Sequence, residues 1–203
     1  MSAARPAVIH IVDDDASVRM SLARLLAHAG YAVQGYASAG DFLVAEPGDG
    51  PACLLLDLAL PGPSGLDLQE ALRRHGRAIP IVFMSAYADV PRTVRAMKAG
   101  ASDFLVKPID AQALMAALER ALAVAGPPAV IHAPPGAPAA PALTERERVV
   151  LRGVAAGRLN KQLAADLQLS ERTIKSCRAE VMRKLGARSF AELVRLATPL
   201  LDD

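Results

Sequence analysis

Carboxylate side chains gather directly after two apolar segments of the chain. The run HIVDDDAS, residues 10–17, contains Asp13, Asp14 and Asp15, and the apolar run ACLLL is followed by Asp57. Three adjacent like charges repel one another, and no Lys or Arg stands beside them in the sequence to offset this. Clustered carboxylates supply the oxygen ligands that a hard cation such as Mg²⁺ prefers. A carboxylate that a metal neutralises can also attack phosphorus and form an aspartyl phosphate.

Two further polar side chains follow later apolar segments and complete this chemistry. Ser85 comes after IPIVFM, and Lys107 comes after SDFLV. A hydroxyl, a lysine and a metal ion can together stabilise the charge on phosphoryl oxygens. A calcium loop is excluded for the DDD run, because no Gly or Glu stands at the offsets that such a loop requires. The residue types therefore predict a Mg²⁺-dependent site that accepts a phosphoryl group.

Alternating strands and helices are expected to position these side chains. The apolar periods predict strands at 7–12, 31–36, 52–57, 79–84 and 102–106, and helices at 16–29, 38–46, 65–76, 89–99 and 110–125. The first, third and fourth strands are almost continuously apolar, as strands covered on both faces are. The pattern predicts an α/β fold with a doubly wound, five-stranded parallel sheet, whose ligands bind at the carboxyl ends of the strands. Asp15 is expected to interact with the dipole of helix 16–29 rather than with a metal.

A proline-rich stretch without charge divides the chain. Residues 126–141 hold six prolines and two glycines, so we expect an extended tether between domains at 7–125 and 142–198. After it the strand signal vanishes, and a small all-α domain is predicted, with helices at 143–157, 160–167, 171–185 and 189–197. Pro199 is expected to end the last helix.

The two parts differ in charge. Residues 1–125 carry 11 Lys and Arg against 13 Asp and Glu, whereas residues 142–198 carry 12 against 6. In helix 171–185 the inward stripe is expected to be Ile174, Cys177, Val181 and Leu185. The opposite face carries Lys175, Ser176, Ala179 and Arg183, with Arg172 at its end. A short helix, a tight turn and a basic second helix predict a helix-turn-helix that binds a DNA major groove.

Composition excludes several other classes of protein. At 52% hydrophobic residues the chain is not disordered overall, and no apolar run approaches the ~20 residues of a membrane span. The start of the chain lacks a signal-peptide core, so a cytoplasmic location is expected. Cys53 and Cys177 suggest no disulfide or metal motif. For Cys177 packing is the expected role, with redox sensing as the alternative.

Residues 7–125 resemble the CheY-like receiver domain of response regulators. The resemblance is carried by VDDD, DLALPGPSGLDL, MSAYADV and AMKAGASDFLVKP, in that order. It implies the strand order 2-1-3-4-5 and a cis peptide bond between Lys107 and Pro108. It also implies that Asp57 is the phosphoacceptor and that Mg²⁺ binds Asp57 together with the residues Asp13, Asp14 and Ala59, the last through its backbone carbonyl.

The same resemblance assigns roles to three more residues. Lys107 would pair with the phosphoryl group, Ser85 would move to bond it, and the rotamer of Phe104 would follow Ser85. The chain departs from the usual family pattern at Ala59-Leu60, where Arg-Met is common, and at Pro63, where Met is common. The residue two positions after the phosphoacceptor influences access of water, so these departures leave the lifetime of the phosphate open.

Residues 142–198 resemble the effector domain of the LuxR/FixJ type almost throughout. They include LTERERVVLRGVAAGRLNKQLAADLQLSERTIKSCRAEVMRKLGARS, and the two domains together resemble the FixJ group of the NarL/FixJ response regulators. The resemblance implies that Lys175, Ser176 and Ala179 approach bases. Phosphate or other DNA contacts are expected from Arg172, Thr173, Lys161 and Arg183.

These features predict a phosphorylation-activated transcription regulator, not a dedicated enzyme. The expected partners are a sensor histidine kinase, double-stranded DNA and RNA polymerase, with a homodimer when phosphorylated and a monomer otherwise. A phosphatase with an Asp nucleophile would need a second Asp where Ala59 stands, and a phosphate sink would need no DNA-binding domain. The alternative that stays open is a regulator that binds DNA constitutively, with phosphorylation tuning another step.

Overall fold

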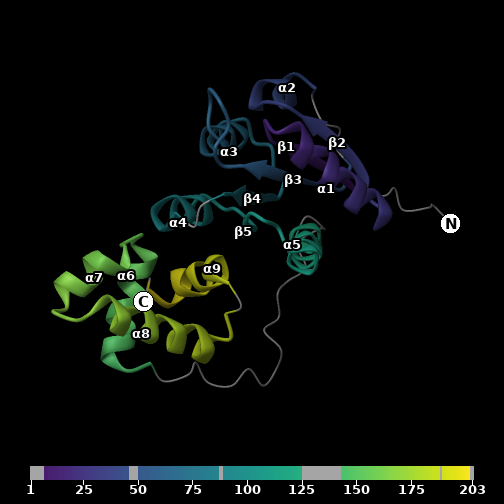
Figure 1. The fold of residues 1–203 in the computed structure, drawn as a ribbon. Coiled ribbons are helices and arrows are strands. Elements are labelled where there is room, and N and C mark those ends of the chain that lie inside the picture. The colour runs from purple at the N-terminus through teal and green to yellow at the C-terminus, as the bar shows by residue number, and fades with distance from the viewer. Residues whose placement is uncertain (1–6, 46–49, 87–88, 125–142, 188, 202–203) are drawn as a thin grey trace. The chain divides into compact units, whose positions relative to one another are not determined.

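The strands form one parallel sheet. The computed structural model describes residues 7–45, 50–86, 89–124, 143–187 and 189–201. Its strands are β1 (Val8–Val12), β2 (Ala32–Tyr36), β3 (Ala52–Asp57), β4 (Ile81–Ser85) and β5 (Asp103–Val106). The order β2-β1-β3-β4-β5, with every neighbouring pair parallel, confirms the predicted topology (Figure 1). Every residue of β3 and β4 is buried, as expected for strands covered on both faces.

One helix follows each strand. These helices are α1 (Ala16–His28), α2 (Ala39–Val44), α3 (Gly65–Arg74), α4 (Val90–Lys98) and α5 (Ala111–Val124). Helices α1 and α5 cover one face of the sheet and bury a core that includes Ile9, Leu55 and Leu118, while α2 and α3 lie on the other face (Figure 1). Parallel strands joined through helices bring all the carboxyl ends of the strands to one edge. That edge is where the acidic side chains meet.

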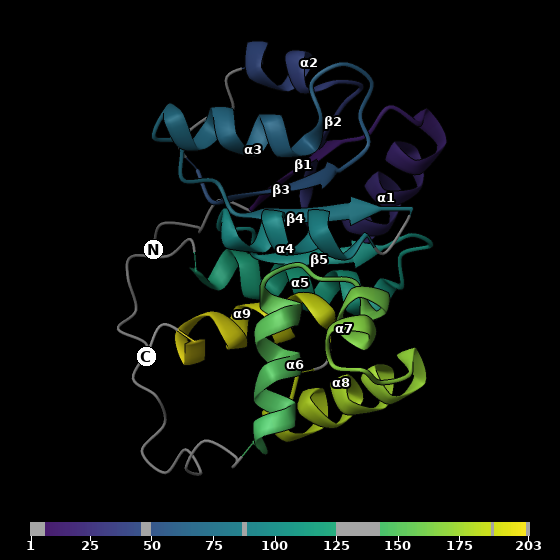
Figure 2. The same cartoon turned by 90° about the vertical axis from the view of Figure 1, so that its left-hand side faces the viewer.

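The C-terminal residues are all helical, as predicted. They form α6 (Glu145–Ala155), α7 (Asn160–Asp166), α8 (Glu171–Leu185) and α9 (Phe190–Leu201), which pack around Val150, Leu163, Ile174 and Leu193 (Figure 2). The side chain of Thr144 accepts a hydrogen bond from the Glu147 amide, and Glu147 Oε2 accepts one from Thr144 N, which together form a capping box at the start of α6. In the described part of the chain, the sheet with α1, α2, α3 and α5 belongs to one compact unit, and α6–α9 belong to a second.

Proline explains two of the differences between the predicted and the observed element boundaries. Strand β4 begins at Ile81 rather than at 79, because Pro80 has no N–H for the ladder and contributes only its carbonyl, which accepts from Leu54 N. At its other end the strand includes Ser85, which pairs with Val106 of β5, whereas the prediction ended at residue 84. Helix α9 continues through Pro199 to Leu201 instead of stopping at 197. Proline removes one donor, but its fixed φ is compatible with helix.

Other predictions fall outside the described residues. The tether at 126–141 belongs to the stretch 125–142, and residue 46 at the end of the second predicted helix is also outside the described residues.

The predicted cis peptide bond between Lys107 and Pro108 is present in the structure.

Candidate functional site

Three carboxylates meet at the carboxyl ends of β1 and β3. Asp13 and Asp14 directly follow β1, and Asp57 is the last residue of β3. Each offers an oxygen atom, and these atoms all lie within 4.8 Å of one another. Asp13 and Asp57 are buried, whereas Asp14 is exposed. Hard carboxylate oxygens at this spacing fit a divalent cation that keeps part of its water shell.

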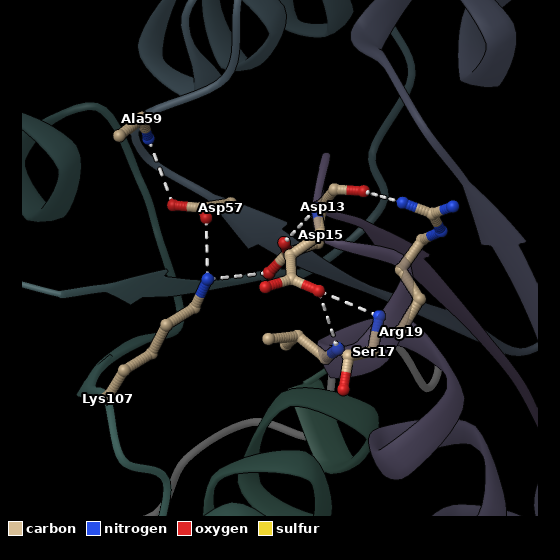
Figure 3. Close-up of polar contacts among 8 residues, drawn as sticks. Asp13, Asp15, Ser17, Arg19, Asp57, Ala59 and Lys107 are labelled. Carbon is tan, nitrogen blue, oxygen red and sulfur yellow. Dashed lines mark hydrogen bonds and ion pairs between the residues drawn. The ribbon is translucent and has the colours of Figure 1, made fainter.

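Lys107 reaches into this cluster from the end of β5. Its Nζ atom donates hydrogen bonds of 2.6 Å to Asp13 Oδ2 and 2.6 Å to Asp57 Oδ2 (Figure 3). Burial raises the pKa of Asp13 and outweighs the opposing effect of Lys107. Burial also works to lower the pKa of Lys107, but the hydrogen bonds and charges of the two aspartates raise it overall. The lysine is therefore a cation fixed between two carboxylates.

Asp15 serves the helix and stands apart from the oxygen cluster. Its Oδ1 atom accepts hydrogen bonds from Ser17 N at 2.7 Å and Val18 N at 3.3 Å, which makes it the N-cap of α1 (Figure 3). Its own amide donates to Asp13 Oδ1 at 3.0 Å. The prediction that Asp15 interacts with the start of this helix is confirmed, and the interaction is a direct cap.

Arg19 is a site residue that the sequence analysis missed. Its Nη1 atom donates a 2.6 Å hydrogen bond to the backbone oxygen of Asp13 (Figure 3). Long side chains in a helix point back toward its N-terminus, so an arginine in the first turns of α1 can reach the preceding loop. This direction of helical side chains is the signal from which the contact of Arg19 with the loop could have been predicted. The run DDD therefore has cations beside it in space, Arg19 and Lys107, although it has none beside it in sequence.

The backbone fixes the position of Asp57. The amide of Ala59 donates to Asp57 Oδ1 at 3.0 Å, and Leu58 N donates to Met84 O at 2.9 Å. Gly65, the first residue of α3, lies against the backbone carbonyl of Asp57: an ideal Cβ there would be 2.4 Å from Asp57 O. Only a residue without Cβ allows this approach of α3 to the end of β3.

Ser85 and Phe104 lie on the two neighbouring strands. Ser85 ends β4 and is 4% exposed, and its carbonyl accepts from Lys107 N at 2.8 Å. Phe104 is buried on β5, with its ring centroid 6.4 Å from that of Phe83. Both residues are therefore close in the sheet to the strand ends that carry the acidic cluster. Their switching roles stay predictions.

Helix α8 presents the face that the sequence predicted. Ile174 and Val181 are buried, and Cys177 and Leu185 pack partly buried against the same core. The exposed positions of α8 include Lys175, Ser176, Ala179, Arg172 and Arg183. On α7 Lys161 is exposed, and Thr173 Oγ1 lies 2.8 Å from Ser170 Oγ at the N-cap of α8. Small and basic residues thus share the solvent face of the second helix of the helix-turn-helix.

Two arginines of α8 have partners within the protein. Arg183 Nη2 lies 2.5 Å from Glu180 Oε1, a surface pair of small energetic value. Arg178, which the sequence analysis did not single out, donates from Nη1 to Asn160 Oδ1 at 3.4 Å. Its guanidinium also lies 5.2 Å from the ring centroid of Phe190. Arg178 therefore links α8 to α7 and α9.

Cys53 is buried, and Cys177 is partly buried. Burial raises the pKa of Cys53 to about 12, and burial also raises that of Cys177. A raised thiol pKa disfavours the reactive thiolate, which agrees with packing rather than redox sensing. Within the described ranges, no helix is both long and apolar enough to cross a bilayer.

Comparisons with known proteins agree with this geometry. Residues 9–119 match the family described as "Response regulator receiver domain", and residues 141–197 match "Bacterial regulatory proteins, luxR family". Nodulation protein W of Bradyrhizobium diazoefficiens is 41% identical, over 98% of this chain and 88% of that protein. The transcriptional regulatory protein FixJ of the same organism is 42% identical, over 93% of each chain. A crystal structure of full-length FixJ from B. japonicum has a TM-score of 0.58 and 38% identity, over 96% and 97% of the two chains.

Proposed function

The chain belongs to the NarL/FixJ type of two-component response regulators, and on this basis we propose that Asp57 accepts a phosphoryl group in a Mg²⁺-dependent reaction. A receiver domain implies a histidine kinase as partner, and a LuxR-type domain implies DNA as ligand. The chain therefore joins a signal input to the regulation of transcription. One observation supports the proposal above all: carboxylate oxygens of three aspartates lie close together, and the Nζ atom of Lys107 bonds two of these side chains, Asp13 and Asp57. The third aspartate is Asp14.

The transfer itself needs little from the protein beyond position and charge. A carboxylate oxygen of Asp57 attacks the phosphorus of a phosphohistidine, the P–O bond forms, and the P–N bond breaks toward the imidazole, which takes up a proton. Lys107, already within hydrogen-bond distance of Asp57, would pair with the incoming phosphoryl oxygens. Removing water and presenting fixed charges supplies most of the stabilisation of such a step.

Mg²⁺ is the cation that the donor set suits. Asp13, Asp14 and Asp57 would hold it, together with the backbone carbonyl of Ala59, and waters or phosphoryl oxygens would fill the remaining positions. When bound, the ion neutralises charge between the carboxylates and the phosphoryl group. Lys107 would then exchange its bond with Asp13 for the phosphoryl group.

Phosphorylation is proposed to change the surface beside β5. The hydroxyl of Ser85 would bond a phosphoryl oxygen, and Phe104 would change rotamer with it. Val106, an apolar side chain at the end of β5, is 46% exposed and would lie in a surface that changes. Dimerisation through this region, with a monomer in the absence of the phosphoryl group, would bring two DNA-binding domains together.

Helix α8 is proposed to enter the DNA major groove. Its exposed Lys175, Ser176 and Ala179 would approach base edges. Arg172, Thr173, Lys161 and Arg183 would contact phosphates, which positions the helix without reading sequence. Two helices delivered by a dimer fit half-sites about one helical turn apart. Contact with RNA polymerase would complete the regulation of transcription.

Mass spectrometry of the intact protein tests the phosphoacceptor. After incubation with acetyl phosphate and Mg²⁺, the wild type should gain the mass of one phosphoryl group, and Asp57→Asn should gain none. Asp15→Asn is the matched control, because Asp15 belongs to the same acidic run but caps α1, and asparagine can still accept the capping bonds. Asp15→Asn should therefore be modified like the wild type. Modification of Asp57→Asn to the wild-type extent would contradict the assignment.

A further inference from the structure

Arg19 binds the acidic loop from the side opposite to Lys107. Its Nη1 atom donates to the backbone oxygen of Asp13 at 2.6 Å, and its own amide donates to Asp15 O at 3.0 Å in the first turn of α1. Its aliphatic stem passes β2 at Gly35, where an ideal Cβ would lie 3.8 Å from Arg19 Cδ. The side chain therefore reaches from α1 to the backbone of Asp13 in the loop (Figure 3).

The hydrogen bond from Arg19 is one of three that hold Asp13 in the loop after β1. Asp13 N donates to Tyr36 O at 3.2 Å, and Asp13 Oδ1 accepts from Asp15 N at 3.0 Å. Asp13 is 0% exposed, so its backbone oxygen depends on a protein donor, and Arg19 is that donor. Without the guanidinium, a buried carbonyl loses a charge-assisted bond at the point where the chain turns from β1 toward Asp14.

We propose that Arg19 is a positioning residue for Mg²⁺ binding: it holds the backbone of the acidic loop so that Asp13 and Asp14 present their carboxylates together. This inference rests on the proposed Mg²⁺ site. Arg19 touches no proposed ligand atom, because it bonds the backbone oxygen of Asp13 and not the carboxylate. Loss of a partner that bonds a ligating side chain directly costs about 10–100-fold in metal affinity. Arg19 bonds the backbone that carries the ligand, so we expect the lower end of this range.

The charge of Arg19 works in the opposite direction. A cation near the site repels Mg²⁺, so neutralising Arg19 would by charge alone tighten binding. The side chain of Arg19 is only partly buried, so solvent and salt screen its charge. Because of this screening, removing the charge should raise the affinity for Mg²⁺ only slightly. The loss of affinity from the displaced loop should therefore be the larger effect.

Calorimetric titration of the metal-free, full-length protein with MgCl₂ separates the two effects. Arg19→Gln should bind Mg²⁺ about 10-fold more weakly than the wild type. Arg19→Lys keeps the charge but lacks the planar fork, so its affinity should lie between the two. Arg24→Gln is the matched control, because it removes an exposed arginine from the same helix, and it should bind Mg²⁺ like the wild type.

A second readout uses the protein without metal. Amide hydrogen exchange at Asp15, whose N–H bonds Asp13 Oδ1, should be faster in Arg19→Gln than in Arg24→Gln. Unchanged or tighter Mg²⁺ binding by both Arg19 variants, beside a wild type that binds Mg²⁺, would overturn the inference and leave the proposed function intact. A wild type that does not bind Mg²⁺ would contradict the proposed function, and the inference with it.

Discussion

At the scale of single residues, the acidic run DDD divides by role. Asp13 and Asp14 join Asp57 in one oxygen cluster, while Asp15 caps α1. The order of strands in the sequence was sufficient to predict that Asp13, Asp57 and Lys107 meet, because parallel strands share one edge. The contact of Arg19 could be predicted only in part: the direction of helical side chains allows Arg19 to reach the loop, but its acceptor is a backbone oxygen that carries no pattern in the sequence.

His10 is a buried titratable residue on β1, outside the acidic site. Its Nδ1 atom lies 3.1 Å from the hydroxyl of Tyr36, which donates to Gln34 Oε1 at 2.9 Å. The ring also contacts that of Phe42, with the centroids 5.5 Å apart. Burial lowers the pKa of His10 below its ordinary value. The neutral form is therefore favoured in the folded state.

This lowered pKa gives a pH dependence of stability with a definite sign. The contribution of His10 is fully present above the unfolded pKa of about 6.5 and is lost as the pH falls from there through the lower folded pKa. In His10→Gln, which cannot titrate, the free energy of unfolding should fall less between pH 7 and pH 5 than in the wild type. Urea unfolding across this range measures it. His28→Gln, which removes an exposed histidine from α1, should retain the wild-type decrease, and an equally steep decrease in His10→Gln would contradict the argument.

At the scale of elements, close approach of α3 to the end of β3 depends on one glycine. In Gly65→Ala the new Cβ would meet the backbone oxygen of Asp57 at 2.4 Å, and a backbone atom in a buried strand cannot move away cheaply. The free energy of unfolding should fall by about 1–3 kcal/mol, as for other overpacked sites. Phosphorylation of Asp57 should slow as well, because the carbonyl belongs to the phosphoacceptor itself.

Gly50→Ala is the matched control for this prediction. An ideal Cβ at Gly50 meets nothing within 4 Å, so this variant should unfold at the same urea concentration as the wild type. Equal stability of Gly65→Ala and Gly50→Ala would show that α3 can shift without cost, and would contradict the account.

The elements themselves were largely predictable, and the exceptions have local causes. Apolar periods identified the five strands and the helices between them, and in the structure Thr144 caps the start of α6 and Gly186, with φ +67, caps the end of α8. At Pro80 the predicted strand began too early, and before Pro199 the predicted helix ended too early. Strand β4 begins only after Pro80, because proline has no backbone N–H to donate to the neighbouring strand. Helix α9 continues through Pro199, because the φ angle that the proline ring imposes is compatible with a helix.

At the scale of the whole molecule, two parts with opposite net charge serve two ligands. The first carries the acidic cluster that suits a cation and a phosphoryl group, and the second carries a basic helix face that suits DNA. Charge and periodicity predicted this division. The target sequence could not be predicted, because Ser176 and Ala179 are too small to specify bases by themselves.

The central claim is that phosphorylation at Asp57 controls binding of DNA. The open alternative is a regulator that binds DNA constitutively, with phosphorylation tuning another step. Asp57 is phosphorylated under both hypotheses, so detecting the phosphoryl group cannot distinguish between them. Dimerisation would couple two recognition helices to two half-sites, and such coupling raises affinity without any new contact.

The most direct test is the affinity for a DNA site selected in vitro, measured with and without beryllofluoride in Mg²⁺ at fixed salt concentration. The account predicts that beryllofluoride raises the affinity of the wild type on the order of tenfold or more, with a shift to dimer, and leaves Asp57→Asn unchanged. Equal affinity and an unchanged oligomeric state of the wild type in both conditions would contradict it.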